Sequence, residues 1–166
     1  MDVERQDTHG GSVRYTVGNI GKNLVSLKVG KLMLEEHFKE MDKLQTYNNF
    51  KLRVEKSRDS LVKVLKDIKS NGFHIVGYAA TAKSATVTNY CGIGPEIIDY
   101  ICDTTPMKQG KFSPGKHIPV KPYQEFIDNP SEFSLLFAWN HAKEIMEKDN
   151  DYKGHWITYV PEVKML

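Results

Sequence analysis

The chain lacks the features that mark secreted, membrane-spanning and nucleic-acid-binding proteins. No stretch approaches the roughly 18 apolar residues that a membrane-spanning helix needs. The N-terminal segment MDVERQDTHGG is polar and has no apolar core of a secretory signal. The 23 basic and 21 acidic residues nearly balance, at a net charge of +2, whereas nucleic-acid binders usually carry a strongly basic face. We therefore expect a cytoplasmic protein with neither a membrane nor a nucleic acid as partner.

Residues of the common catalytic and metal sites are also scarce. The two cysteines, Cys91 and Cys102, do not form a CxxC pair, which argues against a zinc site and against a disulfide framework. We expect them to be buried free thiols. The histidines show neither HxH nor HxxxH spacing, and the chain has no nucleophile elbow and no assignable carboxylate pair. The sequence therefore predicts no catalytic or metal-binding residue.

The 166 residues suit one domain with a short appendage. Residues 1–30 form an N-terminal β segment, in which Val13, Tyr15 and Val17 alternate with polar residues after His9-Gly10-Gly11. This histidine is either a site residue or part of a surface hairpin. Because two strands alone are marginal in water, the segment needs a sheet from this domain, from a partner chain or from a missing piece of the polypeptide.

Residues 31–71 have a helical pattern and predict a connector. Apolar residues recur every three or four positions, with an interruption at Thr46–Asn49 and an end at Asn71-Gly72. The longer part is an amphipathic helix of roughly six turns. Ser57–Ser60 contains no apolar residue, so we expect the helix to leave the core or to be exposed there.

Residues 72–166 alternate between strand and helix patterns and predict the main domain. Such alternation indicates an α/β fold, here a Rossmann-like, mostly parallel sheet with helices on both faces. Ligands of these sheets bind beyond the carboxyl ends of the strands. The expected strands are 74–80, 97–103, 117–120, 133–138 and 155–160, and the expected helices are 84–91, 122–128 and 142–148.

The turn Gly77–Ser84 follows a strand and opens a helix, which is a suitable place for an anion. Its small residues would let a ligand approach the backbone. It contains one glycine and is no P-loop, so a plain turn with a solvated Lys83 stays an equal alternative. Asp103 ends the next strand, where it would either bind ribose hydroxyls or cap a turn.

Two further segments face the same expected edge. The loop with Lys108, Lys111, Lys116 and His117 also contains Gly110, Pro114 and Gly115. It is either a flap that closes over a diphosphate through charge-assisted hydrogen bonds or a solvated charged loop. Trp139-Asn140 would stack on a base or sugar, unless the tryptophan belongs to the core.

Several ordered strings resemble one known family. They are THGGS (Thr8–Ser12), GYAATAKSATVTNYCGIG (Gly77–Gly94), PMKQGKFSPGKHIPV (Pro106–Val120), AWN (Ala138–Asn140) and VPE (Val160–Glu162). Together with Asp103 they resemble the C-terminal domain of S-adenosylmethionine-dependent sugar C-methyltransferases, which act on nucleotide-linked 4-keto-deoxysugars. The resemblance covers nearly the whole chain, and Thr8–Ser12 matches the end of the preceding methyltransferase domain.

The resemblance implies a three-part enzyme with a zinc-binding N-terminal part, a Rossmann-type domain for S-adenosylmethionine and a second Rossmann-like domain. The sugar nucleotide would lie in the cleft between the last two. A proton beside the ketone is removed, and the enolate attacks the methyl group of the cofactor. The expected partners are a nucleotide-diphosphate sugar and either a separate methyltransferase subunit or a second copy. Cofactor and zinc are expected only in domains absent from this chain. The implied substrate-binding residues are Gly77, Tyr78, Lys83, Asn89, Asp103, Lys108, Lys111, His117, Trp139 and Asn140.

The chain departs from the family in the turn after the first strand. The family usually has glycine, alanine, proline, alanine and lysine where this chain has Ala79-Ala80-Thr81-Ala82-Lys83. Without the glycine and the proline we expect a turn that is less pre-shaped. Two alternatives to a sugar-nucleotide module therefore stay open: an interaction or dimerisation module with a degraded ligand site, and, less favoured, a small oxidoreductase that uses a nicotinamide dinucleotide.

Overall fold

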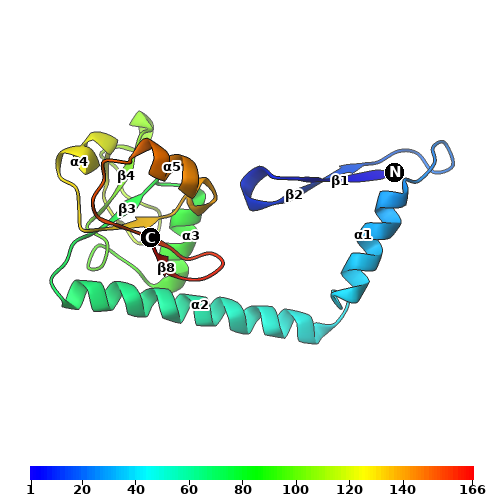
Figure 1. The fold of residues 1–166 in the computed structure, drawn as a ribbon, viewed down its shortest axis with the longest axis horizontal. Coiled ribbons are helices and arrows are strands. Elements are labelled where there is room, and N and C mark those ends of the chain that lie inside the picture. The colour runs from blue at the N-terminus through cyan, green and yellow to red at the C-terminus, as the bar shows by residue number, and fades with distance from the viewer. The chain divides into compact units, whose positions relative to one another are not determined.

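The computed structural model describes all 166 residues, and the chain divides into two compact units. These units are Met1–Val54 and Glu55–Leu166 (Figure 1). Helix α2 contributes residues to both units. None of the helices combines the length and the apolar composition that a bilayer crossing requires.

The smaller unit holds a β-hairpin and a helix, and none of its residues is buried. Strands β1 and β2 pair antiparallel, with Val3 opposite Tyr15, and form a separate two-stranded sheet. The large sheet of this chain therefore does not supply the neighbouring strands that such a hairpin needs. The elements are β1 (Asp2–Gln6), η1 (Thr8–Gly10), β2 (Ser12–Thr16), α1 (Leu27–Phe38) and the first part of α2 (Leu44–Ser70).

The helical segment breaks at a different place from the one expected. Thr46–Asn49 lies inside α2, so the predicted interruption there is wrong. Gln45 Nε2 donates to Asn49 Oδ1 at 2.8 Å, one turn further along, which fits these polar side chains into the helix. The break lies between α1 and α2 instead, where Glu40 takes a left-handed φ of 52°.

The polar stretch Ser57–Ser60 also differs from the expectation. Ser57 is partly buried, and its Oγ donates to the carbonyl oxygen of Tyr159 at 3.3 Å. This part of α2 therefore packs against the rest of the larger unit, because the Ser57 hydroxyl gives the Tyr159 carbonyl oxygen a hydrogen-bond donor at the contact. Further along α2, Leu61 and Leu65 are buried in the core.

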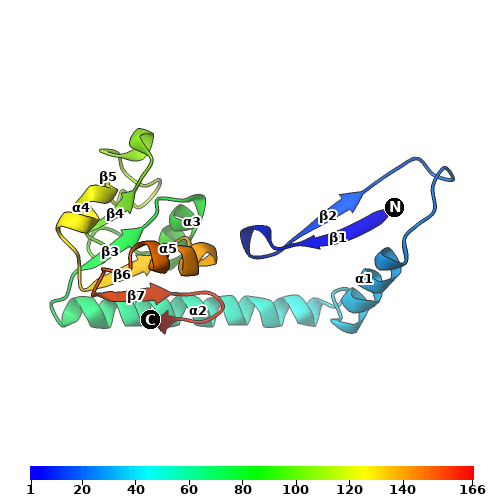
Figure 2. The same cartoon turned by 45° about the horizontal axis from the view of Figure 1, so that its top comes forward.

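The larger unit is built on a six-stranded sheet with the order β5-β4-β3-β6-β7-β8. All neighbouring pairs are parallel except β7 with β8. The common direction of β3, β6 and β7 can be followed in Figure 2. The chain starts at the centre with β3, builds outward to β5, and returns to add β6 on the other side, which is a Rossmann-like order. The predicted fold class is confirmed. The strands are β3 (Ile75–Tyr78), β4 (Tyr100–Asp103), β5 (Val120–Pro122), β6 (Phe133–Leu136), β7 (His155–Thr158) and β8 (Lys164–Met165).

Helices cover both faces of the sheet because every central strand is apolar on both sides. On one face α2 and α3 (Ala82–Cys91) pack on a core that includes Ile75. On the other face α4 (Tyr123–Asp128) and α5 (Ala142–Lys148) pack on a core that includes Val76 and Trp156. Ile75 and Val76 are neighbours in β3 and point to opposite faces. Both cysteines are free, and burial raises the pKa of the Cys102 thiol to about 12.

Candidate functional site

The centre of the large sheet contains a topological switch point, at the carboxyl ends of β3 and β6. These two strands are hydrogen-bonded neighbours, and the chain leaves them in opposite directions along the sheet. Helix α3 begins just after β3, and the 3-10 turn η3 (Trp139–His141) follows β6. Ligands of open parallel sheets bind at such a switch point.

Three of the predicted site residues meet at this position. The Lys83 ammonium donates a hydrogen bond to Asn140 Oδ1. The same ammonium lies 5.1 Å from the centroid of the Trp139 ring, within the range of a cation–π contact. All three side chains are partly buried. The first turn of α3 and the end of β6 thus form one polar cluster, which we call the Lys83 cluster (Lys83, Trp139 and Asn140).

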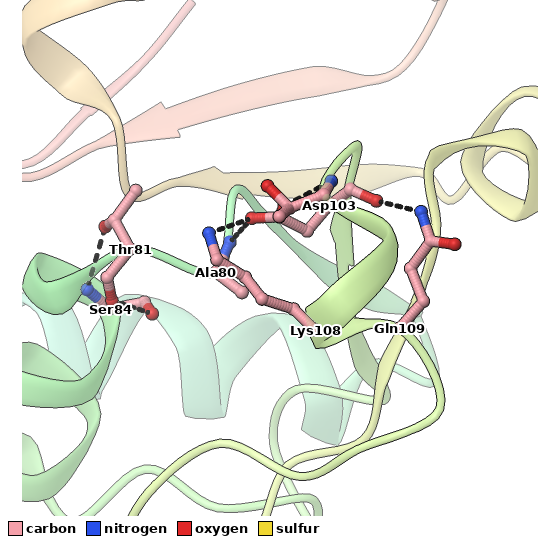
Figure 3. Close-up of polar contacts among 7 residues, drawn as sticks. Ala80, Thr81, Ser84, Asp103, Lys108 and Gln109 are labelled. Atoms are coloured by element: carbon pink, nitrogen blue, oxygen red, sulfur yellow. Dashed lines mark hydrogen bonds and ion pairs between the residues drawn. The ribbon is translucent and has the colours of Figure 1, made fainter.

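The turn before α3 keeps a defined shape although it lacks the glycine and the proline of the resembled family. Ala79, which stands in place of that glycine, has a left-handed φ of 72°, a conformation that costs a residue with a Cβ roughly 1–2 kcal/mol. The Thr81 N–H donates to the Ala79 carbonyl at 2.9 Å, a bond that proline could not make. Thr81 Oγ1 then caps α3 by accepting from the Ser84 N–H at 3.2 Å (Figure 3).

Asp103 joins this turn to the loop after β4. Its Oδ2 accepts from the Ala80 N–H at 2.7 Å and from Lys108 Nζ at 3.1 Å, and its Oδ1 accepts from the Thr105 N–H at 2.8 Å (Figure 3). Burial opposes the ionisation of this carboxyl, but the hydrogen bonds from Thr105 and Lys108 outweigh burial, and the pKa of Asp103 is lowered. Its ribose contact stays a prediction, since these donors already engage both of its oxygens.

Gln109 is a residue of this edge that the sequence did not indicate. Its Nε2 donates to the backbone carbonyl of Asp103 at 2.9 Å (Figure 3). The contact fastens the first part of the loop to the last residue of β4. No sequence motif predicts this contact, because an isolated glutamine in a polar loop has no characteristic spacing.

Gly77 and Tyr78 lie in the core of the sheet. A Cβ added to Gly77 would stand 2.6 Å from Phe137 Cε2, so this glycine makes room for a neighbouring ring. The Tyr78 ring packs edge-on against Trp156, with centroids 5.3 Å apart. Burial first, and then Asp149, raises the pKa of the Tyr78 phenol. The structure thus shows packing roles for both residues, and their predicted contact with substrate is untested.

Asn89, Lys111 and His117 lie away from the Lys83 cluster. Asn89 lies further along α3, about 9 Å or about 1.7 turns from Lys83 at the usual helical rise. Its Nδ2 donates to the Pro114 carbonyl at 2.9 Å. The Lys111 carbonyl accepts from the N–H of Val120, the first residue of β5, at 2.8 Å. Lys111 and His117 are exposed on the short hairpin held by this contact. Lys111 and His117 are therefore near the beginning of β5, and not at its carboxyl end, where a ligand of the sheet would bind.

No group of three or more histidine, cysteine, aspartate or glutamate side chains is placed to hold a metal ion. The cations of the edge are Lys83 and Lys108, which suit an anionic ligand. This edge thus presents the Lys83 ammonium, a helix start, an amide and an indole ring, while the Lys108 ammonium is paired with Asp103.

Two comparisons with known proteins bear on this site. Residues 7–161 match the family model described as the C-methyltransferase C-terminal domain. The chain is also 29% identical, over 170 residues, to a protein named C-methyltransferase NovU from Streptomyces niveus. This alignment covers the whole of the present chain and 40% of that relative, so the chain spans well under half of the relative's length.

Proposed function

Since the chain belongs to the C-methyltransferase C-terminal domain family, we propose that its larger unit binds the nucleotide-diphosphate sugar that such an enzyme methylates. The observation that carries this proposal is the Lys83 cluster at the carboxyl ends of the two central strands. A cation, an amide and a partly exposed indole converge there from segments far apart in the sequence.

The chemistry of the cluster suits a diphosphate linked to a base and a sugar. The first N–H groups of a helix have no partner within the helix, and they point at an anion placed before them. The Lys83 ammonium adds a full positive charge in the same turn. On binding, Lys83 would exchange the Asn140 oxygen for a phosphate oxygen, which forms a stronger charge-assisted hydrogen bond. The Trp139 ring would then be free to stack on the base or the sugar.

The other predicted residues take different roles in this proposal. Lys108 supplies a second cation at the edge, and Asp103 holds it there while it also fixes the turn through Ala80. Lys111 and His117 belong to a hairpin that would reach the ligand only if its exposed side chains turn toward the edge. Asn89 positions that hairpin through Pro114.

We also propose that S-adenosylmethionine and zinc are held by another part of the enzyme, either a separate methyltransferase subunit or the remainder of a longer chain. This proposal is supported by the alignment with C-methyltransferase NovU, because the chain covers only 40% of that protein. Mixed with S-adenosylmethionine and a keto-sugar nucleotide, this chain alone is expected to transfer no methyl group, and detectable turnover would contradict that expectation.

The binding proposal is tested by calorimetric titration with nucleoside diphosphates and nucleotide-diphosphate sugars. We expect Lys83→Ala to weaken binding at least about tenfold, since a hydrogen bond to a charged group contributes about 1.5–3 kcal/mol. Lys66→Ala removes the same charge from an exposed position of α2 and serves as the control. Equal weakening by both variants would show a general charge effect and would count against the site.

An interaction module is the second candidate, and one observation favours it. The unit Met1–Val54 has no buried residue, while Ile20, Leu24 and Leu27 are more than nine-tenths exposed. Such apolar exposure is typical of a surface that another polypeptide covers. If no nucleotide of the panel binds, this candidate replaces the sugar-nucleotide module.

A further inference from the structure

Tyr159 reaches the Lys83 cluster from the interior of the larger unit. It follows the last residue of β7, while Trp139 belongs to the turn that follows β6. Because β6 and β7 are parallel neighbours, the two residues lie at the same edge of the sheet. Tyr159 is 7% exposed and belongs to the core on which α2 and α3 pack, and the partly buried Trp139 packs against this core.

The Tyr159 hydroxyl has two hydrogen-bond partners, and both involve the chain at Trp139. The hydroxyl donates to the carbonyl oxygen of Phe137, two residues before the tryptophan, at 3.4 Å. It accepts from the Trp139 side chain, whose one polar group is the indole N–H. Burial raises the pKa of the phenol, and the hydrogen bond from Trp139 acts against that rise. One buried hydroxyl therefore links the indole ring to the backbone that leads into it.

The phenol is itself held in place. Its ring is packed in the core, and Phe137, which accepts its hydrogen bond, is 0% exposed. The backbone carbonyl oxygen of Tyr159 accepts a hydrogen bond from Ser57 Oγ in α2 at 3.3 Å. A partly exposed tryptophan without such a partner can occupy several rotamers, and the ordering of a side chain on binding weakens affinity. The Tyr159 hydroxyl therefore gives the indole a fixed orientation before any ligand arrives.

The orientation of the indole matters to one part of a nucleotide only. The Lys83 ammonium lies 5.1 Å from the centroid of the indole ring. When a phosphate oxygen draws this ammonium away, the ring becomes available to a planar aromatic group, and every nucleotide base has such a π-face. The diphosphate instead meets Lys83 and the start of α3, to which the Tyr159 hydroxyl makes no hydrogen bond.

We propose that Tyr159 is a positioning residue of the nucleotide site: its hydroxyl holds the Trp139 indole in the orientation in which the ring stacks on the base. Tyr159 acts through Trp139 and does not itself touch the ligand. This inference rests on the proposed function, and it assigns the base, rather than the sugar, to the indole.

The test compares a nucleoside diphosphate with inorganic pyrophosphate, which carries the same kind of charge and no base. Calorimetry of the full chain first selects the tightest binder among thymidine, uridine, adenosine and guanosine diphosphates. We expect Trp139→Ala to weaken its binding at least about fivefold, since the stacking of a base on an aromatic side chain contributes on that scale. Tyr159→Phe removes only the hydroxyl and should weaken nucleotide binding about three- to tenfold. The affinity of Tyr159→Phe for pyrophosphate, measured by competition with the nucleotide, should stay within about twofold of the unmodified value.

Two further measurements show whether Tyr159 acts through the indole. When Trp139→Ala is already present, Tyr159→Phe should weaken nucleotide binding no further, because the group that it positions is gone. The second measurement is ligand-free NMR of the indole N–H signals, of which the chain has two, from Trp139 and Trp156. In the unmodified chain the Trp139 signal should exchange slowly with solvent. In Tyr159→Phe it should shift and exchange faster, while the Trp156 signal stays unchanged.

Tyr100→Phe is the matched control, since the Tyr100 hydroxyl is also buried but has no hydrogen-bond partner. It should change neither nucleotide binding nor the indole signals. Nucleotide binding that depends on Lys83 but is unchanged in Tyr159→Phe would overturn this inference alone. An equal weakening of pyrophosphate, which indicates a structural role only, would overturn it too, as would a fast-exchanging Trp139 indole in the unmodified chain, a result that needs no variant. Absence of nucleotide binding by the unmodified chain would instead overturn the proposed function, and the assignment of Trp139 to the base with it.

Discussion

Replacement of Gly77 by alanine tests whether this glycine serves the packing of the sheet. The added Cβ would stand 2.6 Å from Phe137 Cε2 and 2.9 Å from Ile101 Cγ1, both closer than real Cβ contacts. Neither neighbour has room to move into solvent, because Phe137 and Ile101 are both 0% exposed. The methyl group must therefore push apart two side chains of the core that α2 and α3 cover.

Two effects of opposite sign decide how much Gly77→Ala changes the free energy of unfolding. Alanine restricts the unfolded chain more than glycine does, which stabilises the folded state by about 0.4–1 kcal/mol where the site is compatible. Overpacking of a filled core costs about 1–3 kcal/mol. Because the contacts at Gly77 lie on two sides, we expect the overpacking to prevail, with a net loss of about 1–2 kcal/mol in the free energy of unfolding.

The assay is urea unfolding followed by tryptophan fluorescence, since both tryptophans, Trp139 and Trp156, belong to the larger unit. With a slope of about 1–3 kcal/mol per molar urea, the expected loss lowers the midpoint by about 1 M. Gly30→Ala is the control, since a Cβ there meets nothing within 4 Å and should not lower this midpoint. An unchanged or higher midpoint for Gly77→Ala would refute the packing argument.

Four further predictions concern other parts of the chain. Ala79→Gly should raise the free energy of unfolding by about 1 kcal/mol, because it removes the left-handed strain of alanine; a loss in urea unfolding would contradict this. The folded pKa of Asp103 is lowered, so this carboxylate stabilises the fold above a pH of about 4, and its contribution declines as the pH falls toward the lowered pKa. Asp103→Asn should therefore flatten the fall of the urea midpoint between about pH 7 and pH 3. An equally steep fall in the variant would contradict this. Gly115→Ala would bring a Cβ within 2.0 Å of Asn89 Oδ1 at a φ of +83°, so hydrogen exchange should show faster opening of the 111–119 hairpin, and unchanged protection there would argue against this fastening role. The peptide Met1–Val54 has no buried residue, so it should show no cooperative thermal transition by circular dichroism.

The secondary structure of the larger unit could be predicted well because its signals are local. The apolar runs around Ile75 and Leu135 identify buried strands, and the small residues after Tyr78 indicate a turn into a helix. The same reasoning placed the break of the long helix at Thr46–Asn49, which is wrong. Polar residues interrupt the apolar periodicity in the sequence, but they do not end the helix when side chains one turn apart, such as Gln45 and Asn49, are hydrogen-bonded to each other.

The candidate site could be predicted only in part. Lys83, Trp139 and Asn140 were each expected at the carboxyl edge, and the structure brings them together. Lys111 was expected at the same edge and lies near the beginning of β5 instead, for a reason that the composition of the loop does not reveal. The loop after β4 folds back, so the Lys111 carbonyl pairs with Val120 at the beginning of β5.

The sequence by itself determined the α/β class, the family and the residue types available for binding an anion. These follow from periodicity and from ordered strings, which depend on neighbours along the chain. Only the tertiary structure decided which residues meet: Lys83 bonds to Asn140 across 57 positions, and the Tyr123 hydroxyl bonds to Asp149 across 26 positions. Strand order and helix packing set such contacts, and they depend on how distant segments share a core rather than on any local pattern.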